Sequence, residues 1–288
     1  MATANMKDVK RRIKSVESTK QITKAMELVA SSKLRKAKER AEKAQPFFKA
    51  LYETMCEIAG NNKILSQYAS KNIVKTCLVV VIAGDRGLAG GFNHNVLKLA
   101  AQRIDELKGE GLNVKVLPLG KKSVEYFEKR KYDIVNPLQH IAEGMTIYKS
   151  QEIADYVIGM FKHGEIGSAE LVYTTLVSAL SQEPVHVKML PVQGFDNTPK
   201  DKVVSLTIYD PSPEEVFDEL IPKYLNGMLY GAIVDSFAAE QAARRTAMES
   251  ASDNAGEMID NLSLLYNRAR QAQITQELTE IVSGSMKK

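Results

Sequence analysis

A glycine-rich segment at residues 84–93 is the part of the chain whose residue types and spacing come nearest to a chemical site. It reads GDRGLAGGFN and lies between an apolar run and a helical pattern. A phosphate could bind there, because the free N–H groups at a helix N-terminus attract anions. The spacing matches neither the dinucleotide fingerprint G-x-G-x-x-G nor the P-loop, in which Lys and a hydroxyl residue follow the last glycine. We therefore favour a structural turn over nucleotide binding. The residues assigned to this turn are Gly84, Asp85, Arg86, Gly87, Gly90 and Gly91.

Other patterns that would indicate catalysis are absent from the sequence. The histidines and cysteines lack the spacing of metal ligands, and no Ser-His-Asp, nucleophile-elbow or metal-binding helix motif occurs. Two cysteines are too few for a disulfide framework, so a reducing, cytoplasmic setting is expected. We expect no catalytic residue, no metal and no cofactor. The residues considered are His94, His140, His163, His186, Cys56 and Cys77.

The composition is that of a soluble protein. Of the 288 residues, 44% are hydrophobic and 26% are charged. The longest apolar run, residues 77–83, is far shorter than the about 20 residues that a membrane helix needs. The basic N-terminus lacks the apolar core of a signal peptide. We therefore expect no transmembrane segment.

The middle of the chain predicts a Rossmann-like α/β domain over residues 73–195. Apolar, β-branched runs alternate with amphipathic stretches, and this alternation is typical of a mostly parallel sheet. Residues 194–202 are expected to form a loop. Strands are expected at 76–83, 114–119, 132–135, 171–176 and 185–190, with a possible last strand at 203–209, and helices at 95–107, 121–129 and 148–162.

The C-terminal part, residues 211–288, predicts one long helix. Ser212, Pro213 and Glu215 form a helix-start signal: an N-cap, a first-turn proline and a capping-box glutamate. Pro222 is expected to kink or restart the helix. From residue 230 to residue 284 there is no proline, and a helix of that length spans roughly 80 Å. Because no ordinary globular core covers such a length, the helix needs a partner helix and a second protein around it.

The partner helix is expected at residues 1–60, where the helical pattern of 7–58 is broken only by Pro46. Small and apolar residues step by four and three, which is the spacing of a coiled-coil seam. Polar residues occupy the seam at Lys20, Thr23 and Glu27, and the apolar stripe slips there to one side. The slipped residues, Ile22, Met26 and Val29, indicate a second binding partner. The seam residues are Met6, Val9, Ile13, Val16, Ala30, Leu34, Ala37, Ala41, Ala44, Phe48, Leu51, Met55 and Ile58.

The C-terminal helix has a seam of its own that is rich in alanine. Charge favours pairing of the two ends, since residues 1–50 carry a net +9 and residues 211–288 a net −5. Exposed ion pairs contribute little, about 0–1 kcal/mol each, so the seams are the stronger argument. We expect a long antiparallel coiled coil. The C-terminal seam residues are Leu225, Leu229, Ala232, Ser236, Ala239, Ala243, Ala247, Ala251, Ala255, Met258, Leu262, Leu265, Ala269 and Ala272.

Two other functions are compatible with parts of the sequence. The turn at 84–93 could belong to a nucleotide-binding enzyme. The basic N-terminal helix could bind nucleic acid or act as a tether. We disfavour nucleic acid, because aromatic residues do not interleave with the basic ones before Phe47 and an acidic helix is available in the same chain.

Three segments resemble the gamma subunits of bacterial F-type ATP synthases, and the resemblance extends over the whole chain. They are IKSVESTKQITKAMELVA at 13–30, the turn at 84–93, and YNRARQAQITQELTEIVSG at 266–284. Ser285 departs from the family, which usually has alanine after that glycine. The cysteine-bearing insertion of chloroplast forms is also missing.

The resemblance implies a central rotor shaft that is not an enzyme by itself. One copy would turn within a hexamer of alternating alpha and beta subunits, and its α/β domain would contact the epsilon subunit and the membrane ring of c subunits. Ion flow through the ring would drive ATP synthesis or hydrolysis at the beta sites. The resemblance also implies a peripheral location on the cytoplasmic face of the bacterial plasma membrane, with no nucleic-acid partner.

The resemblance implies roles for particular residues as well. Lys24 and Met26 correspond to positions that face the moving lever of the beta subunit. A second group corresponds to polar residues that touch the inner wall of the hexamer: Arg270, Gln271, Thr275, Glu277 and Thr279. A third group corresponds to an apolar bearing around the tip of the shaft: Leu278, Ile281 and Val282.

Overall fold

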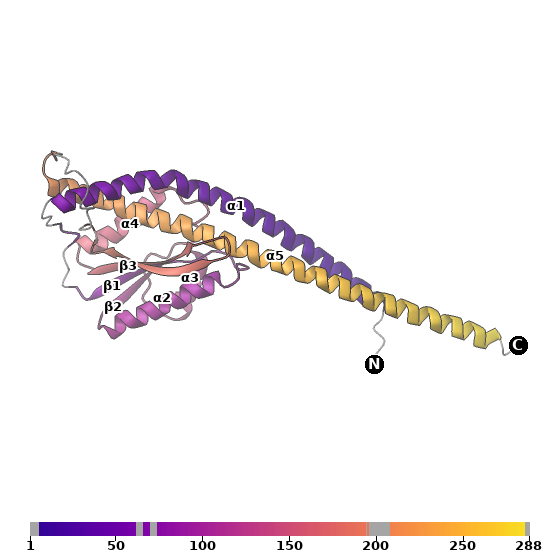
Figure 1. Ribbon diagram of the computed structural model, residues 1–288. Helices are drawn as coiled ribbons and strands as arrows, with labels where there is room; N and C mark the ends of the chain where they lie inside the picture. The colour runs from indigo at the N-terminus through magenta and orange to yellow at the C-terminus, as the bar shows by residue number, and fades with distance from the viewer. Residues whose placement is uncertain (1–5, 62–65, 70–73, 194, 196–207, 286–288) are drawn as a thin grey trace. The chain divides into compact units, whose positions relative to one another are not determined.

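The computed structural model describes residues 6–61, 66–69, 74–193, 195 and 208–285. Contacts divide the chain into two compact units. The α/β unit comprises residues 32–243, and the helical unit comprises residues 1–31 and 244–288. Two helices contribute to both units, α1 (Met6–Asn61) and α5 (Pro213–Ser285) (Figure 1). This division by contacts differs from the predicted boundaries, which follow the type of secondary structure.

The α/β unit contains one sheet of four described strands: β1 (Thr76–Ile82), β2 (Asn113–Leu119), β3 (Ser168–Leu176) and β4 (Gln182–Leu190). The strand order is β2-β1-β3-β4. β1 pairs in parallel with β2 and β3, whereas β4 pairs antiparallel with β3. The predicted mostly parallel sheet is confirmed. The run TCLVVVI forms the central strand because a strand covered on both faces needs apolar side chains at successive positions.

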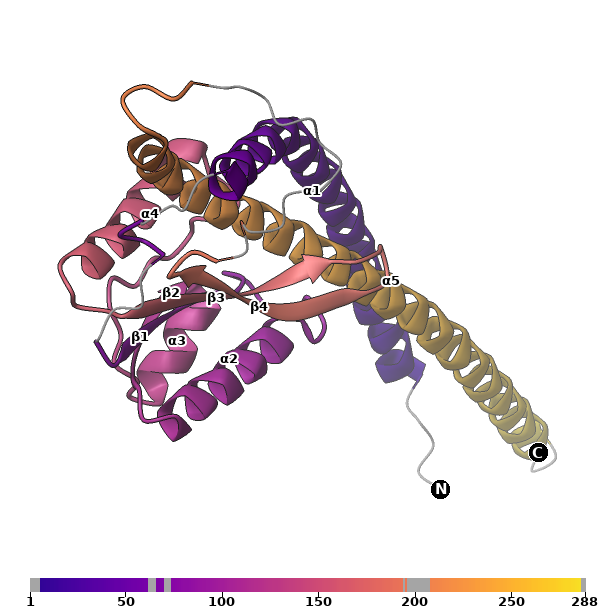
Figure 2. The same ribbon diagram turned by 60° about the vertical axis from the view of Figure 1, so that its left-hand side comes forward.

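Helices cover both faces of the sheet (Figure 2). Cys77, Val79 and Val81 of β1 pack towards α2 (Phe92–Gly109) and α3 (Lys121–Lys129). The alternate residues of β1, Leu78, Val80 and Ile82, share a core with α4 (Ile147–Lys162) and with the parts of α1 and α5 in this unit. The alternation follows from the period of two along a strand.

Several sequence expectations are corrected or lie outside the described residues. Residues 132–135 do not form a strand, although Val116 and Ile134 make an isolated bridge. The pairing with β2 is interrupted because Asn136 adopts a positive φ of 43° and the following proline has no N–H to donate, and it resumes only at an isolated bridge between Leu119 and Leu138. The possible last strand at 203–209 and the loop at 194–202 fall almost entirely outside the described residues.

The prolines within the terminal helices do not interrupt them. The expected break at Pro46 is wrong, since α1 continues through it to Asn61. Pro46 is exposed, so water can hydrate the carbonyl that loses its intrahelical hydrogen bond. α5 also continues through Pro222 and does not restart there. The start of α5 is as predicted: the N–H of Glu215 donates to the Ser212 hydroxyl at 3.2 Å.

Within the α/β unit, α1 and α5 pack antiparallel. The ring of Phe48 lies 6.4 Å from that of Tyr230, and the ring of Tyr52 lies 6.1 Å from that of Tyr224. Later residues of α1 therefore meet earlier residues of α5. The predicted seam positions Leu51, Met55, Ile58, Leu225, Leu229 and Ala239 are buried here, whereas Ala41 is exposed.

In the helical unit the seam of α1 is in the predicted register, and that of α5 passes through the predicted residues Ala255, Leu262 and Ala269 but departs from the prediction between them. On α1 the buried positions include Val9, Ala30 and the polar residues Thr23 and Glu27. On α5 the predicted seam residues Met258 and Leu265 are exposed, and the residues that follow them are half-buried instead. The steps along the observed seam alternate strictly between four and three, which keeps it on one side of the helix. The observed seam is Met248, Ser252, Ala255, Ile259, Leu262, Tyr266 and Ala269.

Candidate functional site

The first candidate surface is on α1 in the helical unit, outside its seam. Ile22, Leu28 and Val29 are exposed by 58%, 61% and 55%. Met26, which lies between Ile22 and Leu28 in the sequence, is half-buried. The slipped apolar stripe therefore does not face α5, as its register predicts. Leu28 was not part of the predicted stripe, and its spacing of six from Ile22 places it about 120° around the helix from that residue.

Lys24 lies on the other flank of the seam from Met26, because two residues correspond to about 200° around a helix, and it is held by its own helix. The Nζ of Lys24 lies 3.0 Å from Oε2 of Glu27, and Glu27 is a buried seam residue. The Thr23 hydroxyl donates to the carbonyl of Lys20 at 3.0 Å. These local contacts satisfy the polar seam residues within α1. The cation of Lys24 is thus restricted in position, and the side chain one turn further along its row of the helix is the exposed Leu28.

The second candidate surface is the last part of α5, where residues 271–283 are all exposed. The predicted contact residues Gln271, Glu277 and Thr279 lie there, and Arg270 just before them is also exposed. The Thr275 and Thr279 hydroxyls donate to backbone carbonyls one turn earlier, at 2.9 and 2.8 Å. Gln273 donates to Glu277 at 2.9 Å. The polar groups are therefore ordered on the helix while they remain accessible.

An apolar stripe runs along the same part of α5. The predicted bearing residues Leu278, Ile281 and Val282 are exposed by 57%, 68% and 56%. Ile274 belongs to the same face, since spacings of four, seven and eight residues fall on one side of a helix. Sequence reasoning left Ile274 out of this group, although that spacing would have found it. None of these side chains is covered by the described part of the chain.

The turn at 84–93 lies in the α/β unit at the carboxyl end of β1. The N–H of Gly84 donates to the Asn93 side chain at 2.8 Å, and the Asn93 amide donates to the carbonyl of Arg86 at 3.2 Å. Leu88 and Gly90 adopt positive φ values of 61° and 55°. The side chain of Asn93 thus closes the turn from within.

Asp85 connects this turn to the start of α3. Its Oδ1 accepts the N–H of Lys121 at 2.8 Å and that of His140 at 2.9 Å. Lys121 is the first residue of α3, and its N-cap, Gly120, has no side chain to offer. A carboxylate at a helix N-terminus is favourable both as a hydrogen-bond acceptor and against the helix dipole. Asp85 therefore caps α3 from 36 positions away.

The turn also packs against α5. Ala89 and Phe92 form a small buried cluster with Ala239. A Cβ added to Gly84 would lie 2.9 Å from the carboxyl carbon of Glu240, which is buried. A phosphate at this position would meet the negative charge of Glu240. The geometry favours a structural turn over a nucleotide site.

Other reactive side chains in the α/β unit are used structurally. Arg103 of α2 holds Glu170 of β3 through two hydrogen bonds of 2.8 and 2.9 Å. These bonds raise the pKa of the Arg103 guanidinium. Burial raises the pKa of the Cys77 thiol to about 11, so the nucleophilic thiolate is scarce near neutral pH. The described residues contain no group of three or more His, Cys, Asp or Glu arranged to hold a metal.

The same described residues contain no helix long and apolar enough to cross a membrane.

Comparison with known proteins gives a consistent result along the whole sequence. A family model described as ATP synthase matches residues 5–286. An ATP synthase gamma chain from Ruminococcus albus is 60% identical over 98% of both chains. The gamma chain from Alkaliphilus metalliredigens is 46% identical over 97% of both. A gamma chain described as sodium ion specific, from Acetobacterium woodii, is 40% identical over 98% of both.

Solved structures show the same fold. A chain in the central stalk and c-ring structure of the Tetrahymena thermophila mitochondrial ATP synthase matches with a TM-score of 0.60 and 24% identity. The match covers 80% of the present chain and 99% of that one. A chain of the Euglena gracilis mitochondrial ATP synthase matches with a TM-score of 0.65 and 17% identity, covering 98% and 93%.

Proposed function

Since this chain belongs to the family of ATP synthase gamma chains, we propose that it turns as the central shaft of a bacterial F-type complex inside a hexamer of alpha and beta subunits. Gamma chains form the central stalk of the rotary ATP synthase and are non-catalytic subunits of it. The chain accordingly transmits rotation between ion flow and the chemistry of ATP, which other subunits carry out.

The observation that supports a surrounding sleeve best is the exposed end of α5. Its residues 271–283 are uncovered on every side, including the apolar stripe of Leu278, Ile281 and Val282. Most of the stability of a helix in a protein comes from tertiary packing, which this end of α5 lacks within the described part of the chain, so a partner that packs against it would stabilise it. An apolar ring around the tip would cover the stripe without locking it, and we assign these three residues to that bearing.

Coupling requires that the shaft contacts differ between the states of the catalytic subunits. A rotor can shift the affinity of a beta site only by the difference in its interaction free energy with the two conformations. We assign the asymmetric contacts to Lys24 and Met26 on α1. On α5 we assign contacts with the inner wall to Arg270, Gln271, Thr275, Glu277 and Thr279.

The remaining partners follow from the same proposal. One copy of the chain would join three alpha and three beta subunits, with the α/β unit beside epsilon and the c-ring. The related gamma chain from Acetobacterium woodii is described as sodium ion specific, and ion transport is common to the family. The assembly would sit on the cytoplasmic face of the plasma membrane, with this chain held there by its partners.

Native mass spectrometry after co-expression tests the assembly. The chain is expressed with candidate alpha and beta subunits, and a complex of three alpha, three beta and one copy of this chain is expected. A truncation that removes residues 271–288 is the comparison, and it should assemble less stably. Recovery of only the free chain and an empty hexamer would contradict the proposal.

Met26→Lys tests the assigned contact on α1. The substitution puts a cation into a stripe whose neighbours Ile22 and Val29 are apolar, so contacts that favour one beta conformation should change. We expect ATP-driven ion pumping in inverted vesicles to fall several-fold more than ATP hydrolysis does. Met26→Leu conserves volume and is expected to leave both unchanged. Equal pumping by the Lys and Leu variants would argue against this role for Met26.

A further inference from the structure

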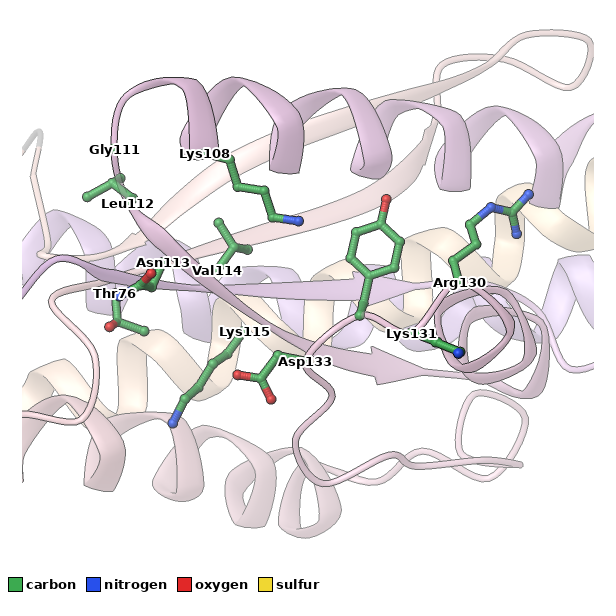
Figure 3. Close-up of a pocket in the computed structure, with 11 residues that line it drawn as sticks. Thr76, Lys108, Gly111, Leu112, Asn113, Val114, Lys115, Arg130, Lys131 and Asp133 are labelled. Carbon is green, nitrogen blue, oxygen red and sulfur yellow. The ribbon is translucent and has the colours of Figure 1, made fainter.

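A cavity of about 1040 Å³ opens at the amino ends of β1 and β2 in the α/β unit (Figure 3). Thr76 and Asn113 begin these two strands, and the chain segments that follow α2 and α3 complete the lining. The cavity lies at the opposite end of the parallel strands from the turn at 84–93. We propose that it binds a multiply charged, phosphate-bearing anion, either free in solution or as the headgroup of an acidic lipid.

The lining has a large surplus of positive charge. Lys108, Lys115, Arg130 and Lys131 line the cavity, and Asp133 is the one carboxylate among the lining residues. Within the described parts of the chain, none of these four cations has a carboxylate within 4.0 Å. By contrast, Lys122 on α3 is neutralised by Glu125 at 2.6 Å. The unneutralised cations come from α2, from β2 and from the segment after α3, so three separate elements contribute positive charge to the lining.

Aromatic rings hold two of these cations in place. Nζ of Lys108 lies 5.0 Å from the centre of the Tyr132 ring, and the Arg130 guanidinium lies 3.7 Å from the centre of the Tyr126 ring. Arg130 also donates one hydrogen bond, from Nη1 to the carbonyl of Tyr126 at 3.3 Å. Four of the five guanidinium N–H groups remain for another acceptor. Cations restricted in this way bind an oxyanion at a smaller cost in side-chain entropy.

The backbone at Lys131 gives independent support. The end of α3 is a Schellman motif, in which Lys131 N–H bonds to Glu128 O at 3.0 Å and Tyr132 N–H bonds to Phe127 O at 3.2 Å. The residue after the cap needs a positive φ, which glycine adopts most easily. Gly111 after α2 and Gly164 after α4 occupy this position with φ values of 80° and 71°. Lys131 adopts a φ of 57° there. Glycine would adopt this φ with less strain than lysine does, so the backbone conformation by itself does not favour a lysine here.

The chemistry of the cavity favours phosphate over a single carboxylate. Its four cations and one carboxylate leave a net formal charge of +3, which a ligand with several negative charges would balance. Guanidinium and ammonium groups are the usual partners of phosphate oxygens. The Thr76 hydroxyl and Asn113 amide add neutral polar groups to the lining.

Calorimetry with the full chain tests the free-anion source. Sodium tripolyphosphate is titrated at low ionic strength into the wild type and into the double variant Lys115→Gln, Lys131→Gln. We expect the double variant to bind about tenfold or more weakly, as the loss of two charged contacts implies. The matched control is Lys98→Gln, Lys149→Gln, which removes the same charge from exposed positions outside the cavity and should bind as the wild type does.

Vesicle sedimentation tests the lipid source with the same three proteins. Vesicles of phosphatidylcholine with phosphatidic acid are compared with vesicles of phosphatidylcholine alone. Loss of either tripolyphosphate or phosphatidic acid binding in the cavity variant only would support the proposal and identify the source. Equal losses in the cavity and control variants, or no binding of either probe by the wild type, would overturn it.

Lys131→Gly separates binding from folding. Because glycine relieves the strained backbone, the thermal midpoint is expected to rise by about 2–4 °C. Binding of the same probe should nevertheless weaken. A variant that becomes more stable and binds as strongly as the wild type would show that Lys131 does not serve the cavity.

Discussion

The same two helices, α1 and α5, are packed in different ways in the two units of this protein. In the α/β unit they join a large apolar core with the sheet and α4. In the helical unit their buried apolar side chains are Val9, Ala30, Met248 and Ala255 among the described residues. A comparable number of polar residues is buried beside them: Thr23, Glu27, Arg244 and Ser252. Full burial of one large apolar side chain contributes about 1.5–3 kcal/mol, so the helical unit gains little from its own interior.

This difference in packing indicates a different role for each unit. A dense core in the α/β unit makes its structure intolerant of added atoms. The helical unit keeps its large apolar side chains on the outside, where a surrounding partner can contact them. A glycine-to-alanine substitution at a packed position should therefore lower the free energy of unfolding more in the α/β unit than in the helical unit.

The largest effect is expected for Gly120→Ala in the α/β unit. Gly120 has a φ of 96°, and an added Cβ would lie 2.0 Å from the backbone oxygen of Ala83. Since neither backbone segment can move freely, we expect the free energy of unfolding to fall by about 4 kcal/mol or more. Urea denaturation followed by tyrosine fluorescence measures the change. Gly109→Ala, where the added Cβ meets nothing within 4 Å, is the control and should cost little.

Gly227→Ala should have the next largest effect. The added Cβ would lie 2.2 Å from two carbons of the Phe48 ring. Phe48 belongs to α1 and packs against α5 in the α/β unit. Overpacking of this kind is expected to destabilise by about 3 kcal/mol. Gly231 lies one turn further along the same helix with open space around it. Gly231→Ala should instead stabilise by up to about 1 kcal/mol. Equal effects of the two substitutions on urea denaturation would contradict this difference in packing.

Ionisation of Cys77 should make the stability of the α/β unit fall in alkali. The thiol has its pKa raised by burial from 9.0 to about 11. Below pH 9 the thiol is protonated in both states, and between pH 9 and 11 only the unfolded state loses the proton. The free energy of unfolding should therefore fall by at most about 2.7 kcal/mol over that range.

Comparison of the wild type with Cys77→Ala, in the slope of the unfolding free energy against pH, isolates the contribution of Cys77. Burial also raises the pKa of Tyr132, Tyr173 and Tyr224, which act in the same direction. Unfolding of Cys77→Ala between pH 8.5 and 11 should thus show a smaller slope against pH, though not a zero slope. A slope identical to that of the wild type would remove Cys77 from the explanation.

The smallest effect is expected for Gly256→Ala in the helical unit. An added Cβ would lie 3.0 Å from Nζ of Lys20, the end of a flexible side chain that can move aside. Alanine has the better helix propensity, so a stabilisation of about 0.5–1 kcal/mol is expected. Hydrogen exchange of amides in residues 244–270 measures it locally. Destabilisation as large as that of Gly227→Ala would mean that the two units do not differ in their tolerance.

Much of the secondary structure could be predicted because it depends on neighbours in the sequence. The helix at Lys121–Lys129 has the predicted ends, and Ser212 caps α5 as its motif indicates. Both follow from spacings of three and four residues and from local hydrogen bonds. The expected strand at 132–135 was wrong because its pairing depends on β2 and on the backbone of Asn136.

The sequence by itself therefore determined where most of the described helices and strands form, which side of α1 carries the seam, and which family the chain resembles. Only the tertiary structure decided that the seam of α5 passes through Met248 and Ser252, because alanines on adjacent rows offered two seams of similar apolarity. It also decided that Asp85 caps α3 and that Lys108, Lys115 and Lys131 line one cavity. These relations join residues from different elements, and their geometry is set by how those elements pack rather than by any local spacing.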